Sequence, residues 1–252
     1  MMLWWAIAVF MLGAVVGSFL NVCIHRLPRE ESIVSPASRC PHCRHAIAWY
    51  DNIPFFSYVL LRGRCRSCRE PIGTRYFLVE GLTAVMALLS YWKFGITPVS
   101  LAAFLFVATL IVITFIDIEH QIIPHEIILP GIPIFFLAAV FVMGVPLLDS
   151  FLGIMVGIGT LYLVAVYYEQ LTGIEGMGGG DVNLMGMLGA FLGWKSLLFI
   201  LMTGAFTGAV VGIIMMINKG KTMKYAVPFG PFLSLGAVVY LFWGRAIVNL
   251  FP

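Results

Sequence analysis

The sequence predicts an all-α polytopic membrane protein of about eight transmembrane helices, with a small zinc-bound cytoplasmic insert between the first two. Three observations predict this class. Of the 252 residues, 61% are apolar and only 11% are charged, against roughly 45–50% and about 25% in soluble domains. The apolar residues form runs long enough to cross a bilayer. Nine of the 15 Lys and Arg residues fall in one polar stretch, 26–76. A soluble enzyme, a disordered chain and a disulfide-rich secreted module are therefore excluded.

The first apolar run, 1–23, is long enough for one crossing at about 1.5 Å per residue. It has no Lys or Arg ahead of its apolar residues and no clear cleavage pattern of small residues, and its basic residues follow it. We therefore expect 1–25 to be a retained transmembrane helix and not a signal peptide. Its N-terminus should lie outside and its basic end in the cytoplasm.

The polar insert, 26–76, contains two C-x2-C pairs, Cys40–Cys43 and Cys65–Cys68, separated by 21 residues. This spacing is typical of a tetrahedral Zn²⁺ site, and four thiolate ligands leave no open position for water, so the ion should be structural. Two disulfides or four idle thiols are the alternatives. A reducing cytoplasm argues against disulfides, and the paired spacing argues against idle thiols. His42 and His45 are expected to be solvated neighbours, and Cys23 a small buried apolar residue.

The remaining segment, 77–252, is expected to form a membrane core of about seven spans. Its apolar runs are 77–92, 98–116, 127–147, 151–168, 182–217 and 226–250. The run 182–217 is too long for one crossing and is interrupted at Gly193-Trp194-Lys195, so we divide it there. The divided model places twelve Lys and Arg residues on the cytoplasmic side and three outside, as the positive-inside rule requires.

Small residues recur at intervals of four in several of these runs, which lets helix backbones approach closely in lipid. We expect these glycines to serve helix packing. They are Gly13 and Gly17, Gly153 and Gly157, and Gly204, Gly208 and Gly212.

Two acidic residues at membrane depth are the candidates for catalysis, because an ionisable group there is costly. Asp117 ends the third span, with Pro124 in the connection that follows, and Asp181 begins the span after a glycine-rich segment. Two spans separate the aspartates, so both should lie at the cytoplasmic face. Simple helix capping by Asp181 and a solvated loop position for Asp117 are the alternatives.

Two carboxyl groups in a partly dry site share one proton near neutral pH. The ionised member can accept a proton from water while the protonated member donates to a carbonyl oxygen, which is the chemistry of an aspartic protease. Gly178, Gly179 and Gly180 precede Asp181 and would let an extended substrate backbone approach the carboxyl groups.

These motifs together resemble those of the type IV prepilin peptidases, which are membrane aspartic proteases of the GxGD type. The resemblance runs over nearly the whole chain. It is carried by Gly17–Asn21 with His25–Pro28, the two C-x2-C pairs, Asp51–Pro54 through Ser57-Tyr58, Arg75-Tyr76 with Glu80, Asp117 with Pro124, Gly178–Asp181 and Pro228–Pro231.

The resemblance implies removal of the basic leader of type IV prepilins and pseudopilins, after a glycine, at the cytoplasmic face of the bacterial inner membrane. Such substrates belong to type IV pilus and type II secretion systems. Members with the four-cysteine insert typically also methylate the new N-terminal amine with S-adenosylmethionine. By the same resemblance Asp117 and Asp181 are the catalytic pair and the four cysteines are the zinc ligands. One departure is Asn183, where the family has a Lys.

Glu80 has two interpretations, an ion pair with Arg75, which we favour, or a contact with substrate or methyl donor. The methyl-donor site itself matches no motif. The expected partners are prepilins or pseudopilins and the lipid bilayer, with no nucleic acid, and the sequence does not set the oligomeric state. Rival functions are a general intramembrane aspartic protease, a proton- or cation-coupled transporter, and a zinc-held scaffold without catalysis. The cysteine insert argues against the first rival, and the lack of an internal repeat argues against the second.

Overall fold

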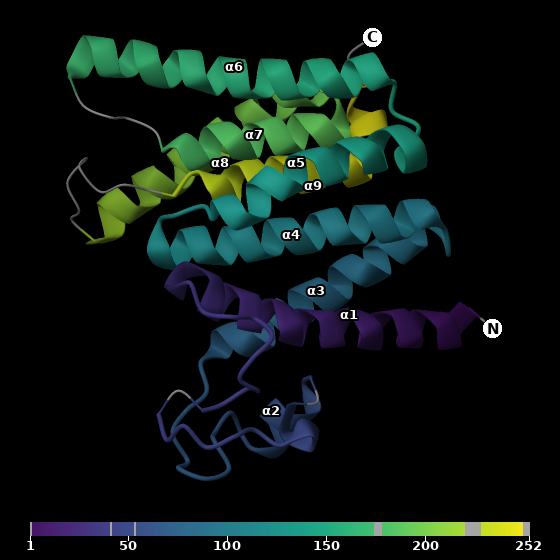
Figure 1. Ribbon diagram of the computed structural model, residues 1–252, viewed down its shortest axis with the longest axis vertical. Coiled ribbons are helices and arrows are strands. Elements are labelled where there is room, and N and C mark those ends of the chain that lie inside the picture. The colour runs from purple at the N-terminus through teal and green to yellow at the C-terminus, as the bar shows by residue number, and fades with distance from the viewer. Residues whose placement is uncertain (1, 41, 53, 174–177, 220–227, 249–252) are drawn as a thin grey trace. The chain divides into compact units, whose positions relative to one another are not determined.

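The structure is a computed structural model that describes residues 2–40, 42–52, 54–173, 178–219 and 228–248 (Figure 1). Within these ranges it is helical, with two isolated β-bridges in the insert and no strand. The predicted all-helical class is confirmed. Most of the predicted cytoplasmic segment 218–225 lies outside the described residues.

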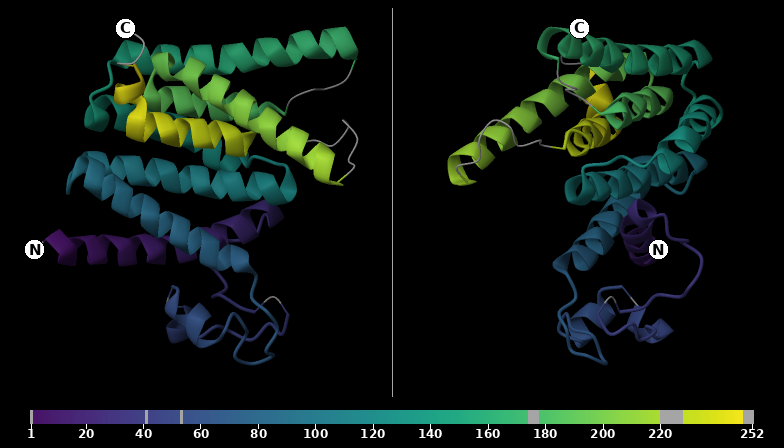
Figure 2. Two further views of the ribbon diagram at one scale, coloured as in Figure 1. Left: turned by 180° about the vertical axis from the view of Figure 1, so that it is seen from behind. Right: turned by 60° about the vertical axis from the view of Figure 1, so that its left-hand side comes forward.

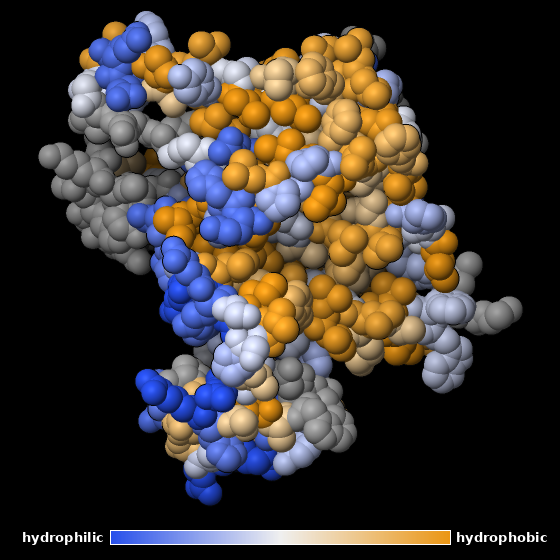
Figure 3. All heavy atoms as spheres, viewed as in Figure 1, coloured by the Kyte–Doolittle hydropathy of each residue, from blue (hydrophilic) through white to orange (hydrophobic). Residues whose placement is uncertain are grey.

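Eight helices match the eight predicted spans, and a short one, α2, lies in the insert. The helices are α1 (Met2–Arg26), α2 (Phe56–Leu60), α3 (Thr74–Phe94), α4 (Pro98–His120), α5 (His125–Ala138), which continues as a π-helical turn (Ala139–Met143), α6 (Leu147–Thr172), α7 (Gly179–Leu192), α8 (Leu197–Lys219) and α9 (Gly230–Val248). Six of the eight are long and apolar enough to cross a membrane, whereas α7 and the apolar part of α9 are shorter. On the face shown in Figure 3, apolar side chains cover most of the helical part, and hydrophilic ones lie over the insert and along the left-hand edge.

The chain divides into two compact units, 1–112 and 113–252. In the first unit α1 and α3 cross and pack against each other (Figure 2). A Cβ at Gly13 would lie 2.8 Å from the Cα atom of Ala84, and a Cβ at Gly17 would lie 2.7 Å from the Cα atom of Glu80. The predicted role of this glycine pair in close helix packing is confirmed.

The second unit is built around α7, whose side chains from Val182 to Phe191 are almost all buried. Helices α5, α6 and α9 pack against it. The backbones of α6 and α7 cross so closely that a Cβ at Gly153 would lie 2.1 Å from the carbonyl oxygen of Gly189. A 14-residue helix is only about 21 Å long, and it can be shorter than the bilayer because protein surrounds it.

The predicted interruption of the long apolar run is confirmed. Helix α7 ends at Leu192, Gly193 adopts a left-handed φ of +79°, and a 3-10 turn (Trp194–Ser196) leads into α8. The indole Nε1 of Trp194 donates a hydrogen bond of 3.2 Å to Asp149 at the start of α6. This contact fastens the turn to the neighbouring helix.

Candidate active site and metal centre

Asp117 lies in the last turn of α4, and its side chain is buried. Its Oδ2 atom accepts a hydrogen bond of 3.0 Å from the backbone N–H of Gly230, the first residue of α9. A Cβ at Gly230 would lie 2.7 Å from that same oxygen, so only glycine lets the start of α9 come this close. The N–H groups at a helix N-terminus carry partial positive charge, which favours an ionised carboxylate there.

Asp181 lies in the first turn of α7. Its Oδ1 atom is buried and has no hydrogen-bond partner among the described residues, and the charge of Asp117 acts on it. The structure therefore brings the two predicted aspartates together within the second unit. The N-cap position of α7 is occupied by Gly178, with no side-chain cap, so the alternative of simple capping by Asp181 does not describe this helix.

The α4–α5 connection fills the space between the starts of α7 and α9. Pro124 is buried and forms the N-cap position of α5. A Cβ at Gly180 would lie 2.8 Å from the Cβ atom of Ile123, and a Cβ at Gly230 would lie 3.2 Å from its Cδ1 atom. Ile123 thus packs between the start of α7, which carries Asp181, and the start of α9, which contacts Asp117. No sequence motif indicated this role.

The three glycines before Asp181 do not share one role. A Cβ at Gly178 or Gly179 would have no atom within 4 Å, whereas Gly180 is packed against Ile123. The expectation of open backbone beside the carboxyl groups therefore fits the first two glycines, and the third is closed off by the protein itself.

The four cysteines of the insert form one cluster. Their sulfur atoms all lie within 4.8 Å of one another, and Cys40 Sγ is 3.8 Å from Cys68 Sγ. The two C-x2-C segments fold alike, because the N–H of Arg44 donates to the Cys40 carbonyl and the N–H of Arg69 donates to the Cys65 carbonyl, both at 2.9 Å. Such a cluster can hold a metal ion such as zinc. None of the four is in a disulfide, so that alternative is wrong.

The thiols of this cluster are polarised by the backbone. Hydrogen bonds from the N–H groups of Cys68 and Ser67 lower the pKa of the Cys65 thiol to about 7. The N–H of Glu70 acts in the same direction on Cys68, yet desolvation and the neighbouring thiols raise the pKa of Cys68 to about 12. Close thiolates repel one another, and a metal ion offsets this repulsion by binding all four sulfur atoms as thiolates. The four cysteines therefore suit a bound cation. His42 and His45 lie outside the cluster, and Cys23 is buried, both as expected.

Glu80 lies on α3 beneath the insert and is buried. Its Oε2 atom accepts a hydrogen bond of 3.1 Å from the N–H of Phe55, and Ser18 of α1 supplies a second hydrogen bond. The favoured ion pair with Arg75 is wrong. Five positions along a helix correspond to about 140° of rotation, so the two side chains leave α3 on different faces.

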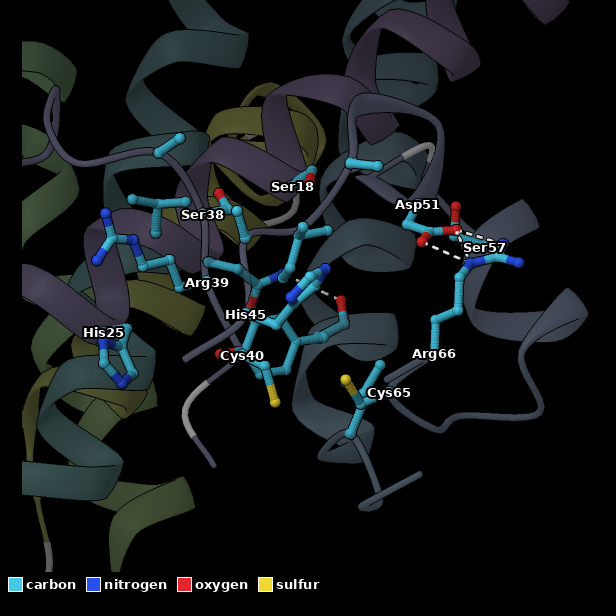
Figure 4. A pocket seen from close by; sticks show the side chains of 18 of the residues that line it. Ser18, His25, Ser38, Arg39, Cys40, His45, Asp51, Ser57, Cys65 and Arg66 are labelled. Carbon is cyan, nitrogen blue, oxygen red and sulfur yellow. Dashed lines mark hydrogen bonds and ion pairs between the residues drawn. The ribbon is translucent and has the colours of Figure 1, made fainter. Parts of the chain in front are cut away.

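A cavity of about 850 Å³ lies in the first unit and was not foreseen from the sequence. Residues of α1, the insert and α3 line it, among them Glu80 and two cluster cysteines, Cys40 and Cys65 (Figure 4). Beside it the guanidinium of Arg66 makes hydrogen bonds of 2.6–3.1 Å with Asp51, and this contact lowers the pKa of the Asp51 carboxyl. Both groups are therefore charged at neutral pH.

Comparison with known proteins gave matches over both units. Residues 11–94 match the model of the bacterial peptidase A24 N-terminal domain, and residues 104–213 match that of the type IV leader peptidase family. A prepilin leader peptidase/N-methyltransferase of Myxococcus xanthus is 42% identical over 217 residues, 86% of this chain and 64% of the relative.

Proteins of the same name from Pseudomonas aeruginosa and Aeromonas hydrophila are 35% and 37% identical, each over 96% of this chain and 91% of the relative. The comparison with solved structures found no match. The apolar helices and these relatives indicate a multi-pass protein of the inner membrane. Because the similarity covers nearly the whole length of relatives more than 30% identical to it, the chain belongs to the type IV leader peptidase family.

Proposed function

We propose that this chain is a membrane aspartic endopeptidase that removes the basic leader of prepilins and pseudopilins after a glycine. We further propose that it methylates the N-terminal amine exposed by that cleavage, using S-adenosylmethionine. The observation that carries the peptidase is the convergence of the buried carboxyl group of Asp117, at the end of α4, with that of Asp181, at the start of α7, whose Oδ1 atom is buried. The names of its relatives support both activities.

The surroundings of the two aspartates favour different protonation states. Asp117 accepts a buried N–H donor from Gly230, and Asp181 Oδ1 accepts none. A hydrogen bond to a charged group contributes about 1.5–3 kcal/mol, more than the roughly 0.3–1 kcal/mol that the start of α7 offers Asp181. Asp117 is therefore the ionised base, and Asp181 holds the shared proton.

In the reaction Asp117 accepts a proton from a water molecule as the water oxygen bonds to the scissile carbonyl carbon. Asp181 donates its proton to the carbonyl oxygen, which gives a neutral tetrahedral intermediate. When the C–N bond breaks, the proton on Asp117 passes to the leaving amine and the intermediate returns its hydroxyl proton to Asp181. The pair then regains its starting charge. Gly178 and Gly179, whose Cβ positions are open, leave room for the substrate backbone.

The proposed orientation places the N-terminus outside and both aspartates at the cytoplasmic face, where a prepilin presents the junction between its basic leader and its apolar helix. In this arrangement 1–25 is the first transmembrane helix, 26–76 the cytoplasmic insert and 77–252 the peptidase core. In the insert Cys40, Cys43, Cys65 and Cys68 would hold a structural Zn²⁺, a role that their mutual distances of at most 4.8 Å permit. S-adenosylmethionine, when bound, would supply an electrophilic methyl group to the pilin amine.

Asparagine variants of the purified protein in detergent test the peptidase. With a prepilin substrate, Asp117→Asn and Asp181→Asn should each lower kcat by roughly 10²–10⁴, the usual contribution of a general acid or base. Asp149→Asn is the matched control, because Asp149 lies beside Gly193 at the other end of α7. Parent-like hydrolysis by either dyad variant would exclude this mechanism.

A further inference from the structure

The cavity of the first unit has no part in the peptidase chemistry proposed above. Its volume of about 850 Å³ falls within the roughly 300–1,000 Å³ of small-molecule sites. Side chains from the cytoplasmic half of α1, from the insert and from the start of α3 surround it. In Figure 4 the aspartate–arginine pair lies at one side of this cavity, and Cys40 and Cys65 lie below His45.

Glu80 contributes a negative charge to the lining of the cavity. The residue is 9% exposed, and the hydrogen bonds that its carboxylate accepts come from a backbone N–H and a hydroxyl group, which are both neutral. Burying a carboxylate without a cation is costly, and a cationic ligand would offset this cost.

Asn21 adds a second acceptor. The residue is 2% exposed, and its side-chain amide nitrogen donates hydrogen bonds to the carbonyl oxygens of Gly17 and Tyr76, at 3.3 and 3.1 Å. Its Oδ1 atom is buried with no partner among the described residues, although the side chain lines the cavity. An unpartnered buried acceptor points to a ligand that carries donors or positive charge.

Aromatic and basic side chains also line the cavity, together with several serines and small apolar residues. Tyr50, Tyr58 and Tyr76 are among them, and a guanidinium group already lies over the ring of Tyr50 and another over that of Tyr76. Aromatic rings can stack on a planar heterocycle. Arg39 and Arg44 also line the cavity, and the described residues give neither side chain a hydrogen-bond or ion-pair partner. Two unpaired guanidinium groups attract a carboxylate and repel a basic leader peptide.

This combination of buried acceptors, tyrosine rings and free guanidinium groups matches a ligand with cationic groups, a heterocycle and a carboxylate. S-adenosylmethionine has a sulfonium and an ammonium group, a purine and a carboxylate. We propose that the cavity is the methyl-donor site, with Glu80 and Asn21 facing the cationic groups and Arg39 and Arg44 near the carboxylate. This inference rests on the methyltransferase half of the proposed function.

Equilibrium dialysis of radiolabelled S-adenosylmethionine against the full-length protein in detergent tests the assignment. The parent should bind one donor per chain. Glu80→Gln removes the charge but keeps an oxygen for the Phe55 N–H, and it should weaken binding roughly 10- to 100-fold, as expected for a lost charge-assisted contact. Arg39→Gln changes an exposed side chain and should weaken binding several-fold. Glu30→Gln, a change at an exposed glutamate outside the lining, should bind as the parent does.

The zinc content and unfolding temperature of every variant identify any that misfolds. If Glu80→Gln misfolds, donor binding by Arg39→Gln tests the assignment in its place. Parent-like binding by the folded cavity variants would overturn the assignment. The assignment would also be overturned if Glu80→Gln bound the donor as the parent does but had a raised KM for prepilin. That result would show that the cavity binds the leader peptide of the substrate.

Methylation of cleaved pilin by the parent separates this inference from the function on which it rests. Methylation that proceeds while the cavity variants bind the donor normally overturns the cavity assignment alone. A parent that cleaves prepilin but neither binds the donor nor methylates pilin overturns the transferase function and the cavity assignment together.

Discussion

Gly180 lies where the start of α7 meets Ile123, and replacing it with alanine tests how the site is assembled. The added Cβ would lie 2.8 Å from the Ile123 Cβ atom, where ordinary contacts begin at 3.4 Å. At least about 0.6 Å must therefore be absorbed, and both partners are anchored on or beside backbone, so neither can simply rotate away. Overpacking of this kind costs about 1–3 kcal/mol.

For a chain of this size 1 kcal/mol corresponds to about 2–4 °C, so Gly180→Ala should lower the unfolding temperature by roughly 2–12 °C. Its kcat for prepilin cleavage should fall by up to about 100-fold, because the shift displaces Asp181 and misplacement by about 1 Å has that effect. Gly179→Ala is the matched control for the unfolding temperature alone, since a Cβ there meets nothing within 4 Å.

Scanning fluorimetry and single-turnover cleavage of a prepilin measure the two effects on the same preparations. Gly179→Ala should unfold at or slightly above the parent temperature, because alanine favours the helix. If the Gly180 and Gly179 variants unfolded at the same temperature, the proposed contact with Ile123 would not exist in the folded protein.

Three further predictions follow from the same contacts. Gly230→Ala puts a Cβ 2.7 Å from Asp117 Oδ2 and should lower kcat roughly 10- to 100-fold with donor binding unchanged; parent-like kcat would show that this hydrogen bond does not matter. Cys40→Ser should lower bound zinc and donor binding while prepilin cleavage continues, because the aspartates lie in the other unit; unchanged zinc stoichiometry by mass spectrometry would contradict the ligand set. Gly153→Ala forces α6 away from α7 and should lower the unfolding temperature by several degrees, whereas Gly212→Ala, with open space at its Cβ, should not; equal effects would refute the close crossing.

The sequence predicted those features that depend on local spacing. The division at Gly193 follows from a glycine beside a tryptophan and a lysine within an apolar run, and the structure has a left-handed residue there. The cysteine cluster follows from two identical spacings. In both cases neighbouring residues determine the outcome, so a short window of sequence contains the needed information.

Contacts between distant segments could not be predicted in this way. The hydrogen bond from Gly230 to Asp117 joins residues 113 apart, and no periodicity links them. The partners of Glu80 were missed for the same reason, because Phe55 belongs to the insert and Ser18 to another helix. The glycines before Asp181 looked equivalent, and only the position of Ile123 distinguishes them.

Cys40 and Cys65 belong both to the metal cluster and to the wall of the proposed donor cavity. Under the proposed assignment, zinc supply governs the methylation activity of this chain and not its peptidase activity. A zinc-starved bacterium would still cleave the leader from its filament subunits, but the amino termini of these subunits would remain unmethylated. The extent of pilin methylation would then record how much zinc the cell had when each filament was built.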